Sequence, residues 1–172
     1  MNKYLIFLII PFTLLVSCGG TNQEVEKQLT SQNNIKNQDI ETQNIEKDWI
    51  EFKIKAVGNT MSDMKFDIEN IQVNEGSWVR IILINEGEQI AMQHNIVFVN
   101  YGARKEVATQ AIEAGPSMKY IPSNENIIAA SDLAQPGETI TLEFKAPKKG
   151  NYEFVCTYPG HSESMRGYFI VK

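Results

Sequence analysis

The residues with the clearest chemistry lie close together near the end of the chain, in the run CTYPGHSESM at 156–165. Cys156 and His161 offer a thiolate and an imidazole, which are strong ligands for copper, and Met165 offers a thioether, a soft and weak ligand that suits Cu(I). The Pro-Gly pair between the cysteine and the histidine predicts a tight turn that brings them together. The run therefore predicts three ligands of one metal site.

A mononuclear copper site of this kind needs a second histidine, and the chain has only one other, His94. This histidine opens a predicted strand at 95–100. In a β-sandwich the start of one strand can lie beside the end of another that is distant in sequence, so His94 and Cys156 can meet at one end of the domain. The candidate ligand set for one copper ion is then His94, Cys156, His161 and Met165.

Each of these residues also has an ordinary structural interpretation. Taken alone, Cys156 is an inert buried thiol, a partner in an intermolecular disulfide or a metal ligand. His94 can be a hydrogen-bonded strand histidine, and Met165 can fill a core. Together they favour the metal site, because separate structural roles give no reason for all four ligand types to occur in this pattern.

The elements that position these residues are expected to be short strands of a half-buried antiparallel sheet, because apolar and polar residues alternate. The segment 66–73 shifts phase once, as a β-bulge would require. Helix formers at 103–114, followed by Gly-Pro, predict a short helical insertion. Together these features predict an all-β Greek-key sandwich of about eight strands, at residues 50–56, 66–73, 78–84, 95–100, 127–130, 139–144, 151–156 and 167–171.

The start of the chain has the pattern of a bacterial lipoprotein signal. Lys3 precedes an apolar run at 4–16 that is too short to span a bilayer comfortably. The run ends in LVSC, which resembles the lipobox, so we expect a signal peptide at 1–17 and lipidation of Cys18. An ordinary signal peptide with a chance cysteine is the alternative. The expected product is an exported, membrane-anchored protein that faces the periplasm or lies at the outer membrane or cell surface.

The segment 18–47 is expected to be the lipidated N-terminus and a flexible tether. Ten of residues 19–47 are Asn or Gln, none is aromatic, and the scattered apolar residues fit no helical stripe. A flexible coil of this length has a root-mean-square reach of about 30 Å. A segment that orders only on contact with a partner is the alternative. The copper-binding domain is expected at 48–172.

The charge of the chain bears on its partners. The formal charge is −5, and no segment concentrates basic residues among exposed aromatic residues, so nucleic acid is not an expected partner. An acidic surface favours a basic partner. We expect redox proteins such as cytochromes or copper enzymes, and a membrane reached through the lipid anchor.

The ligand run resembles that of azurins and the related auracyanins. Four residues separate Cys156 from His161 and three separate His161 from Met165, as in azurins, whereas plastocyanin-type proteins place the histidine closer to the cysteine. The segment Gln93-His94-Asn95 is also similar, and the resemblance covers most of 49–172. It implies a cupredoxin-like fold and a blue copper site with three trigonal ligands, His94, Cys156 and His161, and one weak axial ligand, Met165.

The same resemblance implies roles for the neighbours of His94. Asn95, next to a ligand, is expected to hydrogen-bond near the cysteine sulfur and to help to set the redox potential. The backbone carbonyl of Gln93 is the candidate for a weak contact on the opposite axial side. Azurins commonly have glycine at that position, and they usually have a disulfide that this chain lacks.

The predicted function is single-electron transfer between exported or membrane-associated partners through Cu(I)/Cu(II). Four filled ligand positions leave no open site for a substrate, so the protein is expected to be a carrier and not an enzyme. The exposed edge of His161 is the expected exit for the electron. Weak redox encounters use small interfaces, and the expected docking patch around this edge consists of Met92, Tyr158 and Pro159, with Met61 or Met64 as additional members.

Three other functions have to be considered. A copper storage or delivery lipoprotein is the main alternative, although such a protein should offer exposed, exchangeable sites and often many Met or His residues. A dinuclear domain of the oxidase type needs two cysteines in the ligand loop, and 157–165 contains none. A metal-free binding module would have no reason to retain all four ligand types.

Overall fold

The structure is a computed structural model, and it describes residues 47–172. The expected signal peptide at 1–17, the lipidated Cys18 and nearly all of the tether lie outside the described residues. Among the described residues, no helix is long and apolar enough to cross a membrane.

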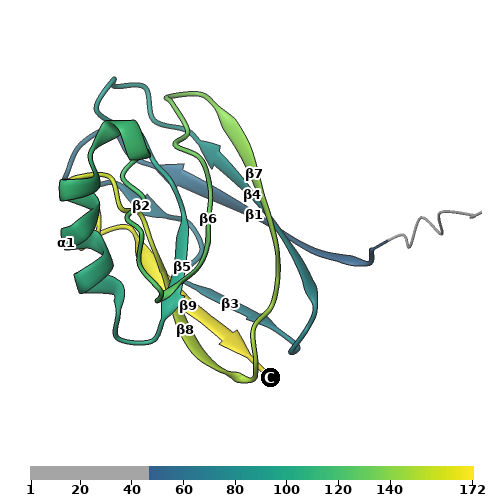
Figure 1. Ribbon diagram of the computed structural model, residues 1–172. Helices are drawn as coiled ribbons and strands as arrows, with labels where there is room; N and C mark the ends of the chain where they lie inside the picture. Colours follow the sequence, from purple (N-terminus) through teal and green to yellow (C-terminus); the bar gives the residue numbers. More distant parts are fainter. Residues whose placement is uncertain (1–46) are drawn as a thin grey trace, which may run out of the picture. The chain divides into compact units, whose positions relative to one another are not determined.

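In this part of the chain nine strands form two sheets that pack face to face (Figure 1). The four-stranded sheet has the order β2-β1-β4-β7, and the five-stranded sheet has the order β3-β9-β8-β5-β6. The strands are β1 (Trp49–Val57), β2 (Lys65–Phe66), β3 (Asn70–Val73), β4 (Trp78–Asn85), β5 (Val97–Asn100), β6 (Ile127–Ala130), β7 (Thr139–Lys145), β8 (Gly150–Val155) and β9 (Arg166–Val171). The fold is therefore a cupredoxin-like β-sandwich, as the sequence predicts.

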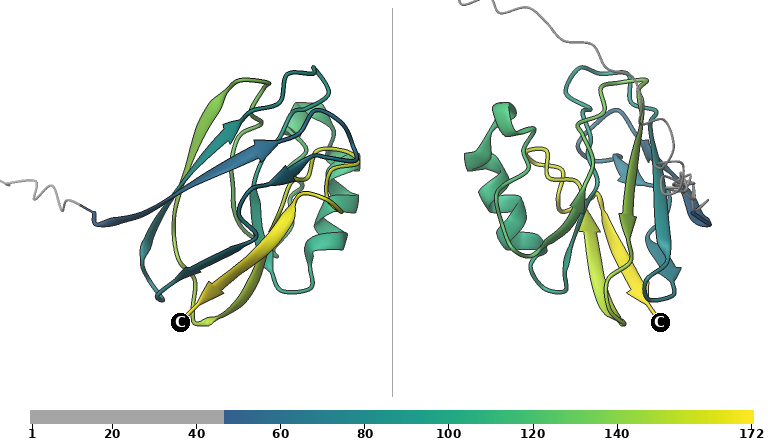
Figure 2. Two further views of the ribbon diagram at one scale, coloured as in Figure 1. Left: turned by 180° about the vertical axis from the view of Figure 1, so that it is seen from behind. Right: turned by 45° about the vertical axis from the view of Figure 1, so that its right-hand side comes forward.

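The expected helical insertion is present as α1 (Arg104–Ala114), followed by the short 3₁₀ helix η1 (Pro116–Met118). Val107 and Ala103 pack with Val97, Val99 and Val155, which lie on the outer face of β5 and β8. The right-hand view of Figure 2 accordingly shows α1 as a separate layer outside the sheet that contains β8. The helix thus covers the back of the strand that leads to Cys156.

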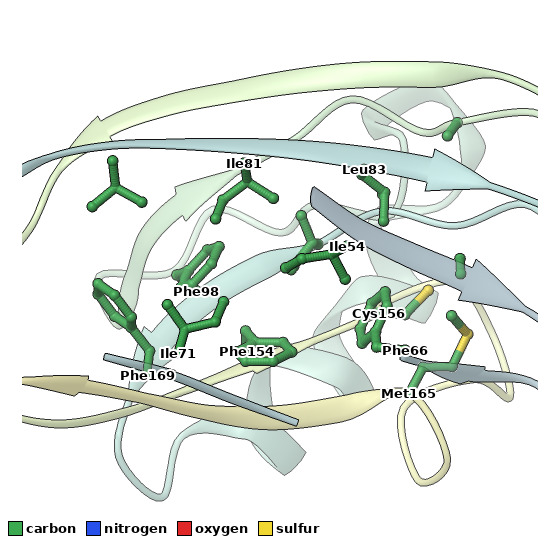
Figure 3. Close-up of a cluster of buried hydrophobic side chains, with 14 of the residues drawn as sticks. Ile54, Phe66, Ile71, Ile81, Leu83, Phe98, Phe154, Cys156, Met165 and Phe169 are labelled. Carbon is green, nitrogen blue, oxygen red and sulfur yellow. The ribbon is translucent and has the colours of Figure 1, made fainter. Parts of the chain in front are cut away.

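The core lies between the sheets and follows from strict alternation. In β4, residues Val79, Ile81 and Leu83 are fully buried, while the residues between them are only half-buried. Phe98, Phe154 and Phe169 face them from the other sheet (Figure 3). Full burial of each such side chain contributes about 1.5–3 kcal/mol. This core holds the two sheets in the relation that the metal site requires.

The expectation of one bulged strand at 66–73 is wrong. Residues 65–66 belong to one sheet and residues 70–73 to the other, so the phase shift marks the point where the chain crosses between sheets. Asp67 N–H donates to the Lys55 carbonyl (3.0 Å) and Tyr168 N–H donates to the Glu69 carbonyl (2.7 Å), which fixes both sides of the crossing.

The expectation of antiparallel pairing is wrong for two of the seven strand pairs. The pairs β1–β4 and β3–β9 are parallel, and the remaining pairs are antiparallel. Side chains alternate between the two faces in either kind of pairing, so the alternation indicates the buried face of a strand without its direction.

Candidate metal centre

Three side chains from two distant parts of the chain meet in one buried cluster. The Nδ1 atoms of His94 and His161 lie 3.2 Å apart, and each lies 3.9 Å from Sγ of Cys156. All three residues are almost completely buried, with at most 1% of their surface exposed. The structure therefore brings together three of the four candidate ligands through the atoms that would bind a metal.

His94 is held by backbone and side-chain hydrogen bonds at the end of the sandwich. Its N–H donates to the Ala134 carbonyl (3.1 Å), and Ala134 N–H donates back to the His94 carbonyl (2.8 Å). The side-chain amide of Asn85, at the end of β4, donates to the carbonyls of Met92 (2.7 Å) and Ala134 (3.1 Å). Gln93, the other predicted neighbour, is half-buried, and its Nε2 donates to the Ile90 carbonyl (3.3 Å).

The loop from β8 to β9 carries the other three candidate ligands, and a backbone hydrogen bond joins its two ends. Cys156 N–H donates to the Met165 carbonyl (2.9 Å), and Met165 N–H donates to the His161 carbonyl (2.9 Å). Met165 is fully buried, and Figure 3 shows its sulfur at the same end of the core as that of Cys156. Gly160 has φ +84°, a conformation that favours glycine, and the Met61 methyl lies 2.7 Å from where a Cβ at residue 160 would be.

Burial sets the protonation of the cluster in the absence of a cation. Desolvation lowers the pKa of His94 to about 4, with a further contribution from the nearby His161, and desolvation lowers the pKa of His161 to about 4. The imidazoles are thus neutral at pH 7 and keep a lone pair. Desolvation raises the pKa of the Cys156 thiol to about 12, although the N–H groups of Asn95 and Tyr158 act in the opposite direction. A metal that binds here must displace the thiol proton.

The donor set fits copper. Two neutral imidazole nitrogens, a cysteine sulfur and a thioether are the ligands of copper electron-transfer sites, whereas Mg²⁺ and Ca²⁺ prefer oxygen. Nε2 of His94 is buried without a hydrogen-bond partner, so the only polar contacts of this ring lie in the cluster. Within residues 47–172, this is the one group of His, Cys, Asp or Glu side chains placed to hold a metal ion.

Asn95 connects the two segments that carry His94 and Cys156. Its Oδ1 accepts a hydrogen bond from Thr157 N–H (2.8 Å), and its Nδ2 donates to Thr157 Oγ1 (2.8 Å) and to the Lys119 carbonyl (3.3 Å). Its backbone N–H points at the cysteine and lowers the pKa of Cys156. Asn95 therefore ties the segment of His94 to the residue that follows Cys156.

Sequence reasoning missed Thr157 and the segment that it holds. Thr157 Oγ1 donates to the Tyr120 carbonyl (2.6 Å). Lys119 and Tyr120 have φ values of +52° and +56°, which are uncommon for residues other than glycine and are found at strained functional sites. This contact could not be predicted from the residue types, because Tyr120 lies in a turn 37 residues before Thr157 in the sequence.

Sequence reasoning also missed Arg104, the first residue of α1. This arginine is 8% exposed, and its Nη1 donates to the Ser162 carbonyl (2.9 Å), one residue after His161. Its Nε lies 3.6 Å from the carboxylate of Glu153, which also accepts a hydrogen bond from Gly102 N–H (2.8 Å). The helix therefore holds the ligand loop through the Arg104–Ser162 hydrogen bond, while Glu153 of β8 balances the charge of the buried arginine.

The expected docking patch is partly corrected. Met92 is 3% exposed because its side chain packs beside Gly87 in the core, and Met64 is also buried, so neither lies at the surface. His161 has no exposed edge, since the Tyr158 ring lies against it with 4.7 Å between the ring centroids. Tyr158 and Pro159 are half-buried at the surface, and Met61 is exposed.

The family described as copper binding proteins of the plastocyanin/azurin family matches residues 52–172. Auracyanin-A of Chloroflexus aurantiacus is 35% identical over 118 residues, which cover 67% of this chain and 72% of that protein. Outer membrane protein H.8 of Neisseria gonorrhoeae is 29% identical over 117 residues, 65% of this chain and 64% of that protein. The solved structure of auracyanin A, a "blue" copper protein from Chloroflexus aurantiacus, matches with a TM-score of 0.65 at 33% identity, over 72% of this chain and 99% of that one. The chain belongs to the plastocyanin/azurin family of copper binding proteins.

Proposed function

We propose that this protein carries single electrons between exported redox partners and binds its copper ion through His94, Cys156, His161 and Met165. The observation that carries the proposal is the convergence of two Nδ1 atoms and one Sγ atom in a fully buried cluster. Family membership supports one copper ion and electron transfer, because azurins and auracyanins are electron carriers and not enzymes. When bound, copper supplies the Cu(I)/Cu(II) couple.

The protein supplies a rigid frame for this couple. The Asn95–Thr157 pair, the Arg104–Ser162 hydrogen bond and the Asn85 amide hold the ligand segments from three sides. Ligands held in this way move little between the two oxidation states, which keeps electron transfer fast. Asn95 hydrogen-bonds beside the cysteine and tunes the potential, and the Gln93 carbonyl is the group available on the opposite axial side.

Tyr158 is the proposed route to the surface. It covers His161, and its other edge contacts Tyr120, with 5.1 Å between these two ring centroids. A redox partner, such as a cytochrome or a copper enzyme, would approach the surface formed by Tyr158 and Pro159. Weak redox encounters need only a small interface. Complete burial of the cluster favours a carrier over a storage or delivery protein, which needs exchangeable copper.

The proposed location is an exported bacterial membrane surface. The lipobox-like LVSC sequence supports lipidation at Cys18, with 1–17 as the signal peptide, 18–47 as the lipidated tether and 48–172 as the copper-binding domain. The name of one relative, outer membrane protein H.8, also supports export. The proposal places the domain on the periplasmic or external side of the membrane.

The test is the visible spectrum of the protein with Cu(II), before and after a mild reductant. We expect an intense blue band that bleaches on reduction, returns on oxidation and is absent in Cys156→Ala. Ser164→Ala, a change of an exposed residue in the same loop, should keep the band. A pale band with weakly held, exchangeable copper would contradict the carrier function and favour copper delivery.

A further inference from the structure

A pair of tryptophans lies at the start of β1 and β4. Trp49 and Trp78 are the only tryptophans of the chain, and they are register partners in the sheet. Their rings make an edge contact, with 5.7 Å between centroids. Lys47 Nζ lies 3.9 Å from the centroid of Trp78, and Lys145 Nζ lies 5.9 Å from it. Both indole rings are half-buried beneath these cations.

More lysines extend the positive charge beyond the rings. Lys145 is the register partner of Trp78, and the turn that follows β7 carries Lys148 and Lys149. These three lysines and Lys47 are exposed. The acidic residues near them include Asp48 and Glu75, and the Glu75 carboxylate accepts a hydrogen bond from the Lys149 N–H (2.8 Å). Two further carboxylates, of Glu51 and Glu143, pair with Arg80, whose guanidinium lies 4.6 Å from the centroid of Trp49. We call this surface the tryptophan pole: Lys47, Trp49, Trp78, Lys145, Lys148 and Lys149.

The tryptophan pole lies at the opposite end of the sandwich from the metal centre. Trp78 begins β4, and Asn85, which holds the segment leading to His94, ends it. An eight-residue strand at about 3.3 Å per residue separates the two ends by about 23 Å. Figure 1 shows the β8–β9 ligand loop at the end of the molecule away from the turn between β7 and β8. Lys47, which belongs to the tryptophan pole, is the first residue that the structure describes, so the preceding chain enters the domain at this pole.

The residue types at this pole are those that settle at a membrane surface. Tryptophan is enriched where lipid headgroups meet hydrocarbon, and lysine is attracted to anionic headgroups. The positions of Lys47 and Lys145 have a local explanation, because a lysine stacked on a tryptophan ring stabilises the fold. It does not explain Lys148 and Lys149, which are exposed and add positive charge at this pole, although the formal charge of the chain is −5.

We propose that the tryptophan pole rests on a bilayer surface that contains anionic lipids, so that the metal centre faces away from the membrane toward its redox partners. The inference rests on the proposed lipid anchor, because the tether enters at this pole. A tether of about 30 residues holds the domain at a high effective concentration near the bilayer, so a weak contact is sufficient to orient it.

The two tryptophans make the test direct, because all tryptophan emission comes from this pole. The mature chain is coupled through Cys18 to a maleimide phospholipid, which spares the fully buried Cys156. The anchor is thus present whether or not the cell lipidates Cys18, and native lipidation is measured separately by mass spectrometry. The copper-free protein is bound to vesicles of phosphatidylcholine, with or without phosphatidylglycerol, whose acyl chains carry bromine as a quencher.

We expect blue-shifted emission and about twofold quenching on vesicles with phosphatidylglycerol, much less on phosphatidylcholine alone, and reversal at high salt. The charge-reversed triple variant at Lys145, Lys148 and Lys149 (each Lys→Glu) should lose the effect. The matched triple variant at the exposed residues Lys53, Lys65 and Lys105 should keep it. Emission that stays unshifted and unquenched on anchored vesicles, or equal loss in both triple variants, would overturn the inference.

Discussion

The two ends of this sandwich use aromatic and polar residues in opposite ways. At the metal centre, Asn95, Thr157 and Arg104 are buried, and each has hydrogen-bond partners from a different element. At the tryptophan pole, Lys47 and Lys145 remain exposed and contact rings that are their neighbours in the sheet or chain. A buried polar network fixes one geometry, whereas exposed cations on aromatic rings can adjust to a changing surface.

The energies of the two regions should differ accordingly. Loss of a partner in a buried network leaves an unsatisfied group and costs about 1–3 kcal/mol. An exposed contact between a cation and an aromatic ring contributes about 0.5–1 kcal/mol. Changes at the metal centre should therefore alter stability and copper chemistry, while changes at the tryptophan pole should leave both almost intact.

The largest expected effect is the pH dependence of the copper-free protein. Burial depresses the folded-state pKa of His94 and His161 to about 4, below the value of 6.5 for the unfolded chain. As the pH falls below 6.5, the unfolded state binds protons first, so stability is lost progressively until about pH 4. We expect a loss of about 3 kcal/mol between pH 7 and pH 5, as measured by urea unfolding at each pH.

The copper-loaded protein is the control for this experiment, because carboxylates titrate in both forms. Bound copper should hold both imidazoles unprotonated and flatten the pH dependence of stability until copper is released. Equal losses of stability with and without copper would show that the two histidines are not the source of the effect.

Asn95→Ala should have the next largest effect. It leaves Thr157 N–H without its acceptor and removes the hydrogen bonds to Thr157 Oγ1 and the Lys119 carbonyl. We expect the free energy of unfolding to fall by about 2–3 kcal/mol and the blue band to shift. Asn151→Ala, at an exposed position of β8, is the matched control and should change neither quantity.

Arg104→Met should loosen the ligand loop and leave the largely buried Glu153 without its charged partner. We expect a loss of about 2 kcal/mol, faster hydrogen exchange of the amides of residues 160–164, and faster release of copper to a chelator. Arg104→Lys should restore part of the slow release. Lys105→Met, the exposed neighbour on α1, is the control, and identical loop exchange in both Met variants would refute the role of Arg104.

The smallest effect is expected at the tryptophan pole. Lys47→Ala removes the closest contact between a cation and the Trp78 ring, and it should lower the free energy of unfolding by about 0.5 kcal/mol. The position and intensity of the blue band should not change. A loss above about 2 kcal/mol would mean that this contact belongs to the structural core of the domain, which would remove the contrast between the two ends.

Local patterns predicted most of the strands and the proximity of Cys156 and His161. Alternation identified the buried faces of the strands, and the short run from Cys156 to Met165 contains its own turn. His94 could be added because the chain has no other histidine to offer. The direction of β1 against β4 was not predictable, because alternation is the same in parallel and antiparallel pairs.

Contacts between segments that are distant in sequence could not be predicted from the sequence. Arg104 begins a largely polar helix and has the pattern of a solvated residue, and it is buried only because the ligand loop folds over it. The burial of Met92 and His161 likewise depends on Asn85, Gly87 and Tyr158, which come from separate segments. The cations of the tryptophan pole are dispersed along the sequence, so no basic segment revealed them.

The parallel pairing of β3 with β9 determines when the copper site can form during biosynthesis. Ile71 is the register partner of Phe169, so the five-stranded sheet cannot close around β3 until residues 166–171 have been made. The same strand follows Met165 directly and anchors the ligand loop. A nascent chain that lacks β9 already carries all four candidate ligands, but it has no strand to close the sheet and to anchor the end of the ligand loop. Such long-range pairing folds slowly, so the ligand loop is expected to become ordered only in the last stage of folding.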